Sequence, residues 1–118
     1  MEMRIFGRTG LRLSVLGFGC GAVGGLMVRG DPLDQERTIA RAIGAGVNYF
    51  DTAVQYGNGE SEKNLGRILQ QLKPPNAVVG TKVRLPSDAT RRRRIPCLSD
   101  AARCVRVMSP RHRQCGRN

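Results

Sequence analysis

The sequence has no tryptophan, and aromatic residues make up only 4% of its 118 positions. A hydrophobic core would therefore consist mostly of aliphatic side chains, and the length allows one small domain. The chain also has a single histidine, and none of its four cysteines forms a Cys-x-x-Cys pair. That absence argues against the common zinc sites and thiol redox motifs.

The sequence also has no apolar run of the roughly 20 residues that a membrane-spanning helix needs. The uncharged stretch at 13–28 is shorter and contains five glycines, which weaken any helix. Arginines precede this stretch, as in a signal peptide, but a strand followed by a glycine-rich loop describes it better. We therefore expect a cytoplasmic protein without a membrane partner.

Positive charge dominates the chain, with a formal net charge of +11. Residues 1–85 contain 11 Lys and Arg against 7 Asp and Glu, whereas residues 86–118 contain 9 Arg, no Lys and 2 Asp. We therefore divide the chain into a patterned part, 1–85, and a basic tail, 86–118, without sustained helical or strand periodicity. This composition predicts a disordered tail or the product of a shifted reading frame.

The tail leaves two alternative functions open. The run from Arg91 to Arg94 would bind nucleic acid electrostatically. Only nonspecific binding is plausible, because the tail has no aromatic side chain to stack on bases. We therefore do not expect a nucleic-acid partner. The other alternative is a regulatory or interaction protein without catalysis.

Patterning in residues 1–85 predicts a hairpin followed by alternating strands and helices. Two short β-like runs flank the turn at Gly7 to Gly10, and a strand is expected from about 13 to 18. Asp31 and Pro32 predict the start of a helix that ends near residue 44. A short buried strand ending at Asp51, a second helix with an apolar stripe, and a strand at 77–83 follow. This order implies parallel strands joined by right-handed crossovers.

Gly19, Gly21 and Gly24 have the Gly-x-Gly-x-x-Gly spacing of a Rossmann dinucleotide site. In that fold a helix begins within the motif, whereas here the helix is predicted to begin only near Asp31. Asp51 also comes 27 residues after Gly24, too far for the acidic residue expected about 20 residues on. A loop at the carboxyl end of a barrel strand fits better, since glycine lets a flat ligand approach the backbone. A flexible loop without a ligand is the alternative.

Asp51, Tyr56 and Lys82 lie at or just after predicted strand ends. Singly, each has an ordinary structural explanation, as a turn cap, a packed ring or a strand-end charge. Together they form a proton donor, because an ammonium makes a nearby phenol more acidic and a carboxylate keeps that ammonium charged and oriented. Such a unit reduces a carbonyl group only if a cofactor supplies the hydride.

The segments GFG, GVNYFDTAVQYGNGESEKNLGR and VVGTKV resemble the aldo-keto reductase family, in order and with family-like spacing, from about Arg4 to Arg84. The opening RTGLRLSVLGFG resembles the subgroup of potassium-channel beta subunits and bacterial sugar dehydrogenases. The resemblance implies an α/β fold, a (β/α)8 TIM barrel with an N-terminal hairpin. It also implies NADP as cofactor and a small carbonyl or sugar substrate.

By the same resemblance, Asp51, Tyr56 and Lys82 match three members of the family's catalytic tetrad. Tyr56 would be the proton donor, Lys82 the group that makes it more acidic, and Asp51 the partner of Lys82. Gly19, Cys20 and Asp51 would lie near the nicotinamide ribose. The fourth member is a histidine, but His112 lies in the charged context SPRHRQCG, which does not suit a buried barrel strand.

A (β/α)8 barrel takes about 250 residues, so we expect only its first part here: the hairpin, about three parallel strands and two helices. The family's segments for the adenosine phosphate and pyrophosphate lie in later strands. We therefore expect a truncated oxidoreductase that is inactive as this chain. We also expect unpaired edges on the first and third parallel strands, and hence marginal stability or aggregation.

Overall fold

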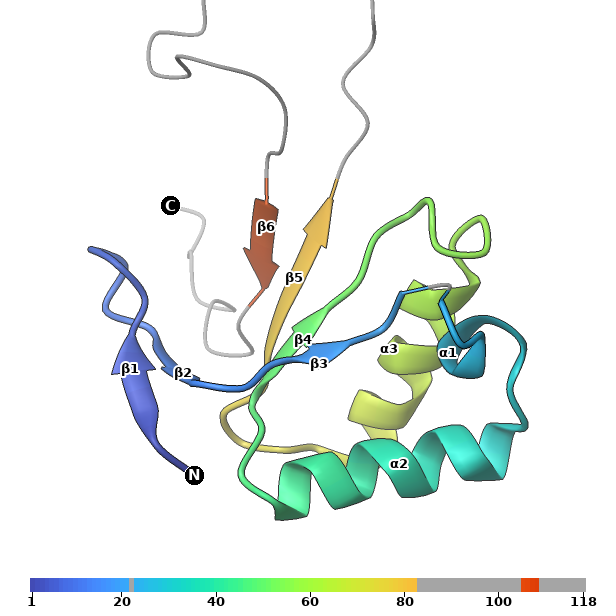
Figure 1. The fold of residues 1–118 in the computed structure, drawn as a ribbon, viewed down its shortest axis with the longest axis horizontal. Helices are drawn as coiled ribbons and strands as arrows, with labels where there is room; N and C mark the ends of the chain where they lie inside the picture. Colours follow the sequence, from blue (N-terminus) through green and yellow to red (C-terminus); the bar gives the residue numbers. More distant parts are fainter. Residues whose placement is uncertain (22, 83–104, 109–118) are drawn as a thin grey trace, which may run out of the picture.

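The N-terminal hairpin is the first element of the computed structural model, which describes residues 1–21, 23–82 and 105–108. Strands β1 (Met3–Ile5) and β2 (Arg12–Ser14) pair antiparallel. Gly7 and Gly10 have φ values of +54° and +73°, which glycine adopts without strain, and they turn the chain between the strands. Figure 1 shows the hairpin beside the main sheet. The predicted hairpin is confirmed.

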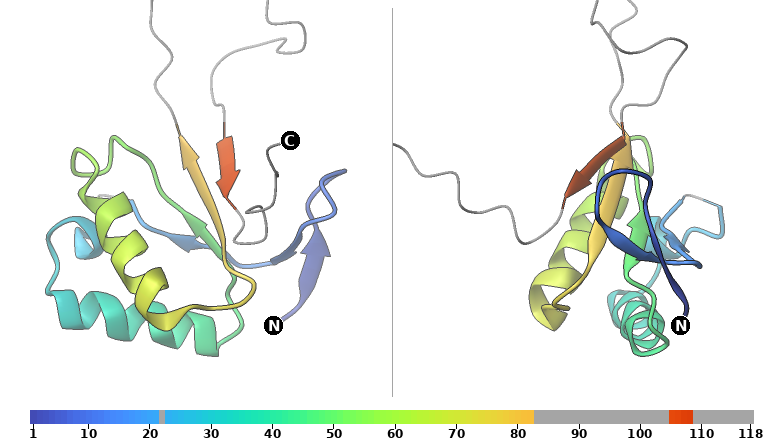
Figure 2. Two further views of the ribbon diagram at one scale, coloured as in Figure 1. Left: turned by 180° about the vertical axis from the view of Figure 1, so that it is seen from behind. Right: turned by 90° about the vertical axis from the view of Figure 1, so that its left-hand side faces the viewer.

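The main sheet has the order β3-β4-β5-β6, and its first three strands are parallel. They are β3 (Phe18–Gly19), β4 (Tyr49–Asp51) and β5 (Val78–Lys82). Helix α2 (Pro32–Gly44) lies in the connection from β3 to β4, and helix α3 (Glu60–Leu72) in that from β4 to β5. Both helices lie beside these strands (Figures 1 and 2). The sheet is open, so the predicted fold class, the first part of a (β/α) barrel, is confirmed.

Local sequence signals explain both long helices. Asp31 caps α2, because its carboxylate accepts hydrogen bonds from the main-chain N–H groups of Leu33 and Asp34 at 2.9 and 3.3 Å. The apolar stripe of α3 buries Leu65 and Ile68. That helix ends at Leu72, and the capping residue after it, Lys73, has a left-handed backbone conformation.

The core lies between the helices and the face of the sheet that carries Phe50. It is mostly aliphatic, as the composition predicted, and the Phe18 and Phe50 rings lie 6.2 Å apart between centroids. Its buried members are Cys20, Met27, Ile39, Phe50, Leu65, Ile68 and Ala77.

The strand expected from about 13 to 18 is wrong in its bounds. Leu13 belongs to the hairpin, opposite Arg4, and the first parallel strand is only Phe18–Gly19. The chain bends between the two strands, where the Ser14 hydroxyl donates a 2.7 Å hydrogen bond to the carbonyl of Leu16. A serine that bonds to nearby backbone in this way competes with strand pairing.

A short helix, α1 (Leu26–Arg29), was not predicted. It directly follows the glycine-rich loop, so the expectation that the first helix begins only near Asp31 is wrong. Side chains of the two long helices hold it in place. Gln35 Nε2 donates to the Leu26 carbonyl at 2.9 Å, and Asn64 Nδ2 donates to the Met27 carbonyl at 3.0 Å. These tertiary contacts satisfy carbonyl groups of a helix too short to be stable alone.

Strand β6 (Val105–Met108) pairs antiparallel with β5, with Val105 opposite Lys82. This corrects two expectations. Part of the tail forms a strand, and the third parallel strand has a neighbour. The unpaired N–H and C=O groups of an edge strand can pair with any extended segment that reaches them. Among the described residues, β3 has only β4 as a neighbour, as expected.

Several sequence predictions lie outside the described residues: those for Arg91 to Arg94, for His112 and for the cysteines at 97, 104 and 115. Within the described part of the chain, no helix has the length and apolarity to cross a membrane.

Asn48 connects the hairpin to the main sheet and should contribute strongly to stability. Its Oδ1 accepts a hydrogen bond from the Ser14 N–H at 2.7 Å, and its Nδ2 donates to the Arg12 carbonyl at 2.9 Å. We expect Asn48→Ala to lower the free energy of unfolding by about 1–3 kcal/mol, measured by urea titration, because it leaves these groups without their partner. The exposed Asn76 offers a control, Asn76→Ala, and equal effects of the two substitutions would contradict this assignment.

Candidate active site

Two of the predicted site residues form an ion pair at the carboxyl ends of neighbouring strands. Lys82 Nζ lies 2.7 Å from each carboxylate oxygen of Asp51 and 3.2 Å from the carbonyl oxygen of Thr52. The sheet register places Asp51 opposite Gly80. Lys82 is two residues beyond Gly80, so both side chains lie on the same face of the sheet.

The third predicted residue, Tyr56, lies beside this pair. Its ring centroid is 5.2 Å from Lys82 Nζ. Tyr56 belongs to the loop that follows β4, and main-chain hydrogen bonds fix it at both sides. The Tyr56 N–H donates to the Ala53 carbonyl at 3.0 Å, and the Ser61 N–H donates to the Tyr56 carbonyl at 3.2 Å. The structure therefore brings Asp51, Tyr56 and Lys82 together.

The environment of Lys82 favours its charged form. Burial by itself lowers the pKa of Lys82, but the hydrogen bond to Asp51, the interaction with Tyr56 and the Asp51 charge together outweigh burial. The net result is a pKa raised above the ordinary value of 10.5. At neutral pH the site thus holds an ammonium group between a carboxylate and a phenol ring.

The raised pKa of Lys82 predicts a loss of stability in strong alkali. Stabilisation by the charged amine is complete below pH 10.5 and is lost as the pH rises through the higher pKa of the folded state. Urea titrations at pH 9 and above pH 11 should therefore show a smaller alkaline loss in Lys82→Met than in the unmodified chain. Lys73→Met, at an exposed position, should lose as much stability in alkali as the unmodified chain does. If Lys82→Met lost as much stability in alkali as the unmodified chain, the prediction would be contradicted.

Gly19 and Cys20 face opposite sides of the sheet. Gly19 pairs with Asp51, and a Cβ atom placed on Gly19 would have no neighbour within 4 Å. The main chain there borders open space beside the carboxylate. The Cys20 side chain is fully buried in the core. Its burial, together with the Asp51 charge, raises the pKa of this thiol to about 12, so it is neither a nucleophile nor a side-chain contact for a cofactor. Because the Cys20 side chain lies in the core, only its main chain could contact a ligand in the open space beside Gly19.

The sequence profile of the "Aldo/keto reductase family" matches residues 15–107. The chain belongs to the aldo/keto reductase family. This confirms the resemblance predicted from the FDTA-x-x-YG-x-GESE segment. The clustered Asp51, Tyr56 and Lys82 therefore belong to a chain of an oxidoreductase family.

Proteins similar to this chain include dehydrogenases. The chain is 40% identical over 82 residues to pyridoxal 4-dehydrogenase of Microbacterium luteolum, covering 70% of this chain and 24% of that one. It is 38% identical over 84 residues to L-galactose dehydrogenase of Arabidopsis thaliana, covering 70% and 26%. A probable voltage-gated potassium channel subunit beta of Oryza sativa subsp. japonica is 33% identical over 85 residues, covering 70% and 25%. The chain thus spans about a quarter of the length of these relatives.

A solved structure shows the same fold. The holo form of an aldo-keto reductase from Bacillus halodurans superposes with a TM-score of 0.60 at 31% sequence identity. The superposition covers 70% of this chain and 26% of that one.

In this aldo/keto reductase chain, Tyr49, which the sequence analysis did not single out, lies two residues before Asp51 on β4 and therefore on the same face of the sheet. Its ring lies over Gly17 and Gly80, where a Cβ atom on either glycine would overlap it. Burial, followed by the Asp51 charge, raises the pKa of Tyr49. In the sequence, Gly80 could have indicated this packed ring, because a glycine inside a strand often marks a close approach by another group.

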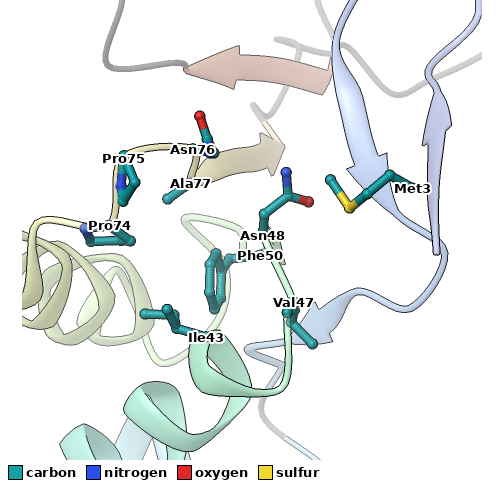
Figure 3. A pocket seen from close by; sticks show the side chains of 10 residues that line it. Met3, Ile43, Val47, Asn48, Phe50, Pro74, Pro75, Asn76 and Ala77 are labelled. Carbon is teal, nitrogen blue, oxygen red and sulfur yellow. The ribbon is translucent and has the colours of Figure 1, made fainter. Parts of the chain in front are cut away.

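A pocket elsewhere in the described part of the chain has no side chains suited to catalysis. It is an apolar pocket of about 240 Å³ at the amino ends of β4 and β5 (Figure 3). The ion pair lies at the carboxyl ends of the same strands. None of the side chains that line the pocket, among them Met3, Ile43 and Phe50, can exchange a proton. Nor does the described part of the chain contain a cluster of three His, Cys, Asp or Glu residues that would suit a metal ion.

Proposed function

We propose that residues 1–82 provide the acid–base group of a site that reduces a small carbonyl compound, or oxidises the corresponding alcohol or sugar, with NADP as cofactor. The observation that carries this proposal is the position of Lys82 Nζ, 2.7 Å from the Asp51 carboxylate and 5.2 Å from the centroid of the Tyr56 ring. Dehydrogenases named for pyridoxal and L-galactose among the relatives support a small substrate.

In this proposal each side chain has one task. The Tyr56 hydroxyl gives its proton to the carbonyl oxygen as negative charge develops there. The ammonium of Lys82 stabilises the resulting phenolate. Asp51 keeps Lys82 charged and holds it in place. In alcohol oxidation the phenolate takes the proton back from the substrate hydroxyl.

The described residues fit the nicotinamide end of the cofactor. Open space at Gly19 lets a flat ring approach the main chain beside Asp51. Gly19, Asp51 and the main chain of Cys20 would hold that end, and NADPH would supply the hydride when bound. The aldo/keto reductase family generally uses this cofactor, which is why we prefer it to the Rossmann interpretation of the glycine loop.

A chimeric enzyme tests the proposal. Residues 1–82 would replace the matching first part of the Bacillus halodurans aldo-keto reductase, which supplies the other barrel strands. We expect NADPH-dependent reduction of small aldehydes, followed by loss of absorbance at the nicotinamide band, with the host enzyme as positive control. A chimera that folds and binds NADPH but gives no turnover with aldehydes, alcohols or sugars that the host accepts would refute the proposed function.

A further inference from the structure

Three buried groups form a hydrogen-bonded network directly behind the proposed site. The side chains of Cys20, Thr52 and Ser61 are at most 1% exposed. Ser61 Oγ donates to the Cys20 carbonyl at 2.7 Å, and the Ser61 and Thr52 hydroxyl oxygens lie 3.0 Å apart. Because the single Ser61 hydroxyl proton is used toward Cys20, Thr52 must be the donor in the second bond.

The network joins every segment that carries a site residue. Thr52 follows Asp51, its N–H donates to the Gly80 carbonyl at 2.8 Å, and its carbonyl accepts from Lys82 Nζ at 3.2 Å. Cys20 follows Gly19, and its N–H donates to the Asp51 carbonyl at 2.8 Å. The main-chain N–H of Ser61 bonds to the Tyr56 carbonyl. Ser61, in the first turn of α3, therefore contacts the segments of Gly19, Asp51 and Tyr56 at once.

We propose that Ser61 is a positioning residue of the active site. Its hydroxyl, through Thr52, holds the Thr52 carbonyl against Lys82 and, through Cys20, fixes the end of β3 at Gly19 beside Asp51. The proposal rests on the proposed function for its catalytic meaning, but its geometry can be tested without activity. Ser61→Ala removes both side-chain bonds and keeps the main-chain bond to Tyr56. Its effects therefore belong to the hydroxyl alone.

The experiment measures the chemical reactivity of the Lys82 amine. This amine can be followed individually because the sequence has only three lysines, Lys63, Lys73 and Lys82. Competitive acetylation of the 118-residue chain near neutral pH, quantified by mass spectrometry, gives the reactivity of Lys82 relative to the exposed Lys73. Loosening the Thr52 carbonyl would lower the pKa of Lys82 and expose its amine. We expect Ser61→Ala to raise the relative reactivity about threefold, which corresponds to half a pKa unit.

A matched control separates positioning from general destabilisation. Ile68→Val, in the buried stripe of the same helix, loosens packing without touching the network. It should lower the melting temperature about as much as Ser61→Ala does, yet leave the relative reactivity of Lys82 unchanged. If Ile68→Val raises the reactivity as much as Ser61→Ala does, Ser61 has only a structural role and the proposal fails.

A second pair of variants decides the matter if Ser61→Ala does not fold. Thr52→Val removes the hydroxyl and keeps the side-chain shape, whereas Thr52→Ser keeps the hydroxyl. We expect high Lys82 reactivity in Thr52→Val and a value near that of the unmodified chain in Thr52→Ser. Equal reactivity in these two variants would overturn the proposal. In the chimera, Ser61→Ala should also lower kcat and shift the pH profile. A chimera without turnover, combined with the expected acetylation pattern, would refute the proposed function and leave the positioning role supported.

Discussion

Tyr56→Phe in the chimeric enzyme is expected to lower kcat by about 10²- to 10⁴-fold, the usual contribution of a positioned general acid. This loss corresponds to about 3–5 kcal/mol of transition-state stabilisation. The substitution removes one hydroxyl and keeps the ring that lies beside Lys82 Nζ. The dissociation constant of NADPH should therefore change little, which a fluorescence titration of the same variant checks. An unchanged kcat would rule out Tyr56 as the acid.

Lys82→Met tests the same acid–base group by removing the ammonium that lies beside Tyr56. Without the ammonium, the phenolate left after proton transfer loses its stabilising charge, and the Asp51 carboxylate loses its partner at 2.7 Å. We expect a loss of kcat as large as that of Tyr56→Phe. Lys63→Met is the matched control, because Lys63 forms an exposed ion pair with Glu60 on α3. If both lysine variants were equally active, the proposed role of Lys82 would be wrong.

The sequence predicted those features that depend on local chemistry or on strand order. Asp31 gave the start of α2 because a carboxylate there caps the free N–H groups of the first turn. The clustering of Asp51 with Lys82 followed from parallel pairing, which brings the carboxyl ends of neighbouring strands to one edge. The proposed role of Tyr56 as proton donor followed from its combination with Asp51 and Lys82 and agreed with the family motif, and the structure places its ring beside the lysine.

The features that the sequence did not predict depend on contacts between distant segments. Helix α1 is held by Gln35 and Asn64, and nothing in the glycine-rich stretch before it indicates those partners. Cys20 follows Gly19 directly, yet the alternation of the strand turns its thiol into the core. Ser61 was part of the quoted motif, but only the fold shows that its hydroxyl reaches the Cys20 carbonyl, 41 residues away along the chain.

The polypeptide of these 118 residues is expected to show no measurable NADPH-dependent reductase activity. In the proposed site, Gly19, Asp51 and the main chain of Cys20 would contact the nicotinamide end of the cofactor. With only those contacts, the adenosine half of NADPH would stay in water, and most of the free-energy cost of ordering the cofactor would not be offset.

This argument also predicts how weakly the polypeptide binds the cofactor. We expect a dissociation constant for NADPH weaker than about 1 mM, which corresponds to a binding free energy of only about 4 kcal/mol. Titration followed by NADPH fluorescence measures this directly, with little protein background because the chain has no tryptophan. The chimera, which has a complete barrel, should bind far more tightly in the same assay. Micromolar binding by the 118-residue polypeptide would contradict the prediction and favour the Rossmann interpretation of Gly19, Gly21 and Gly24.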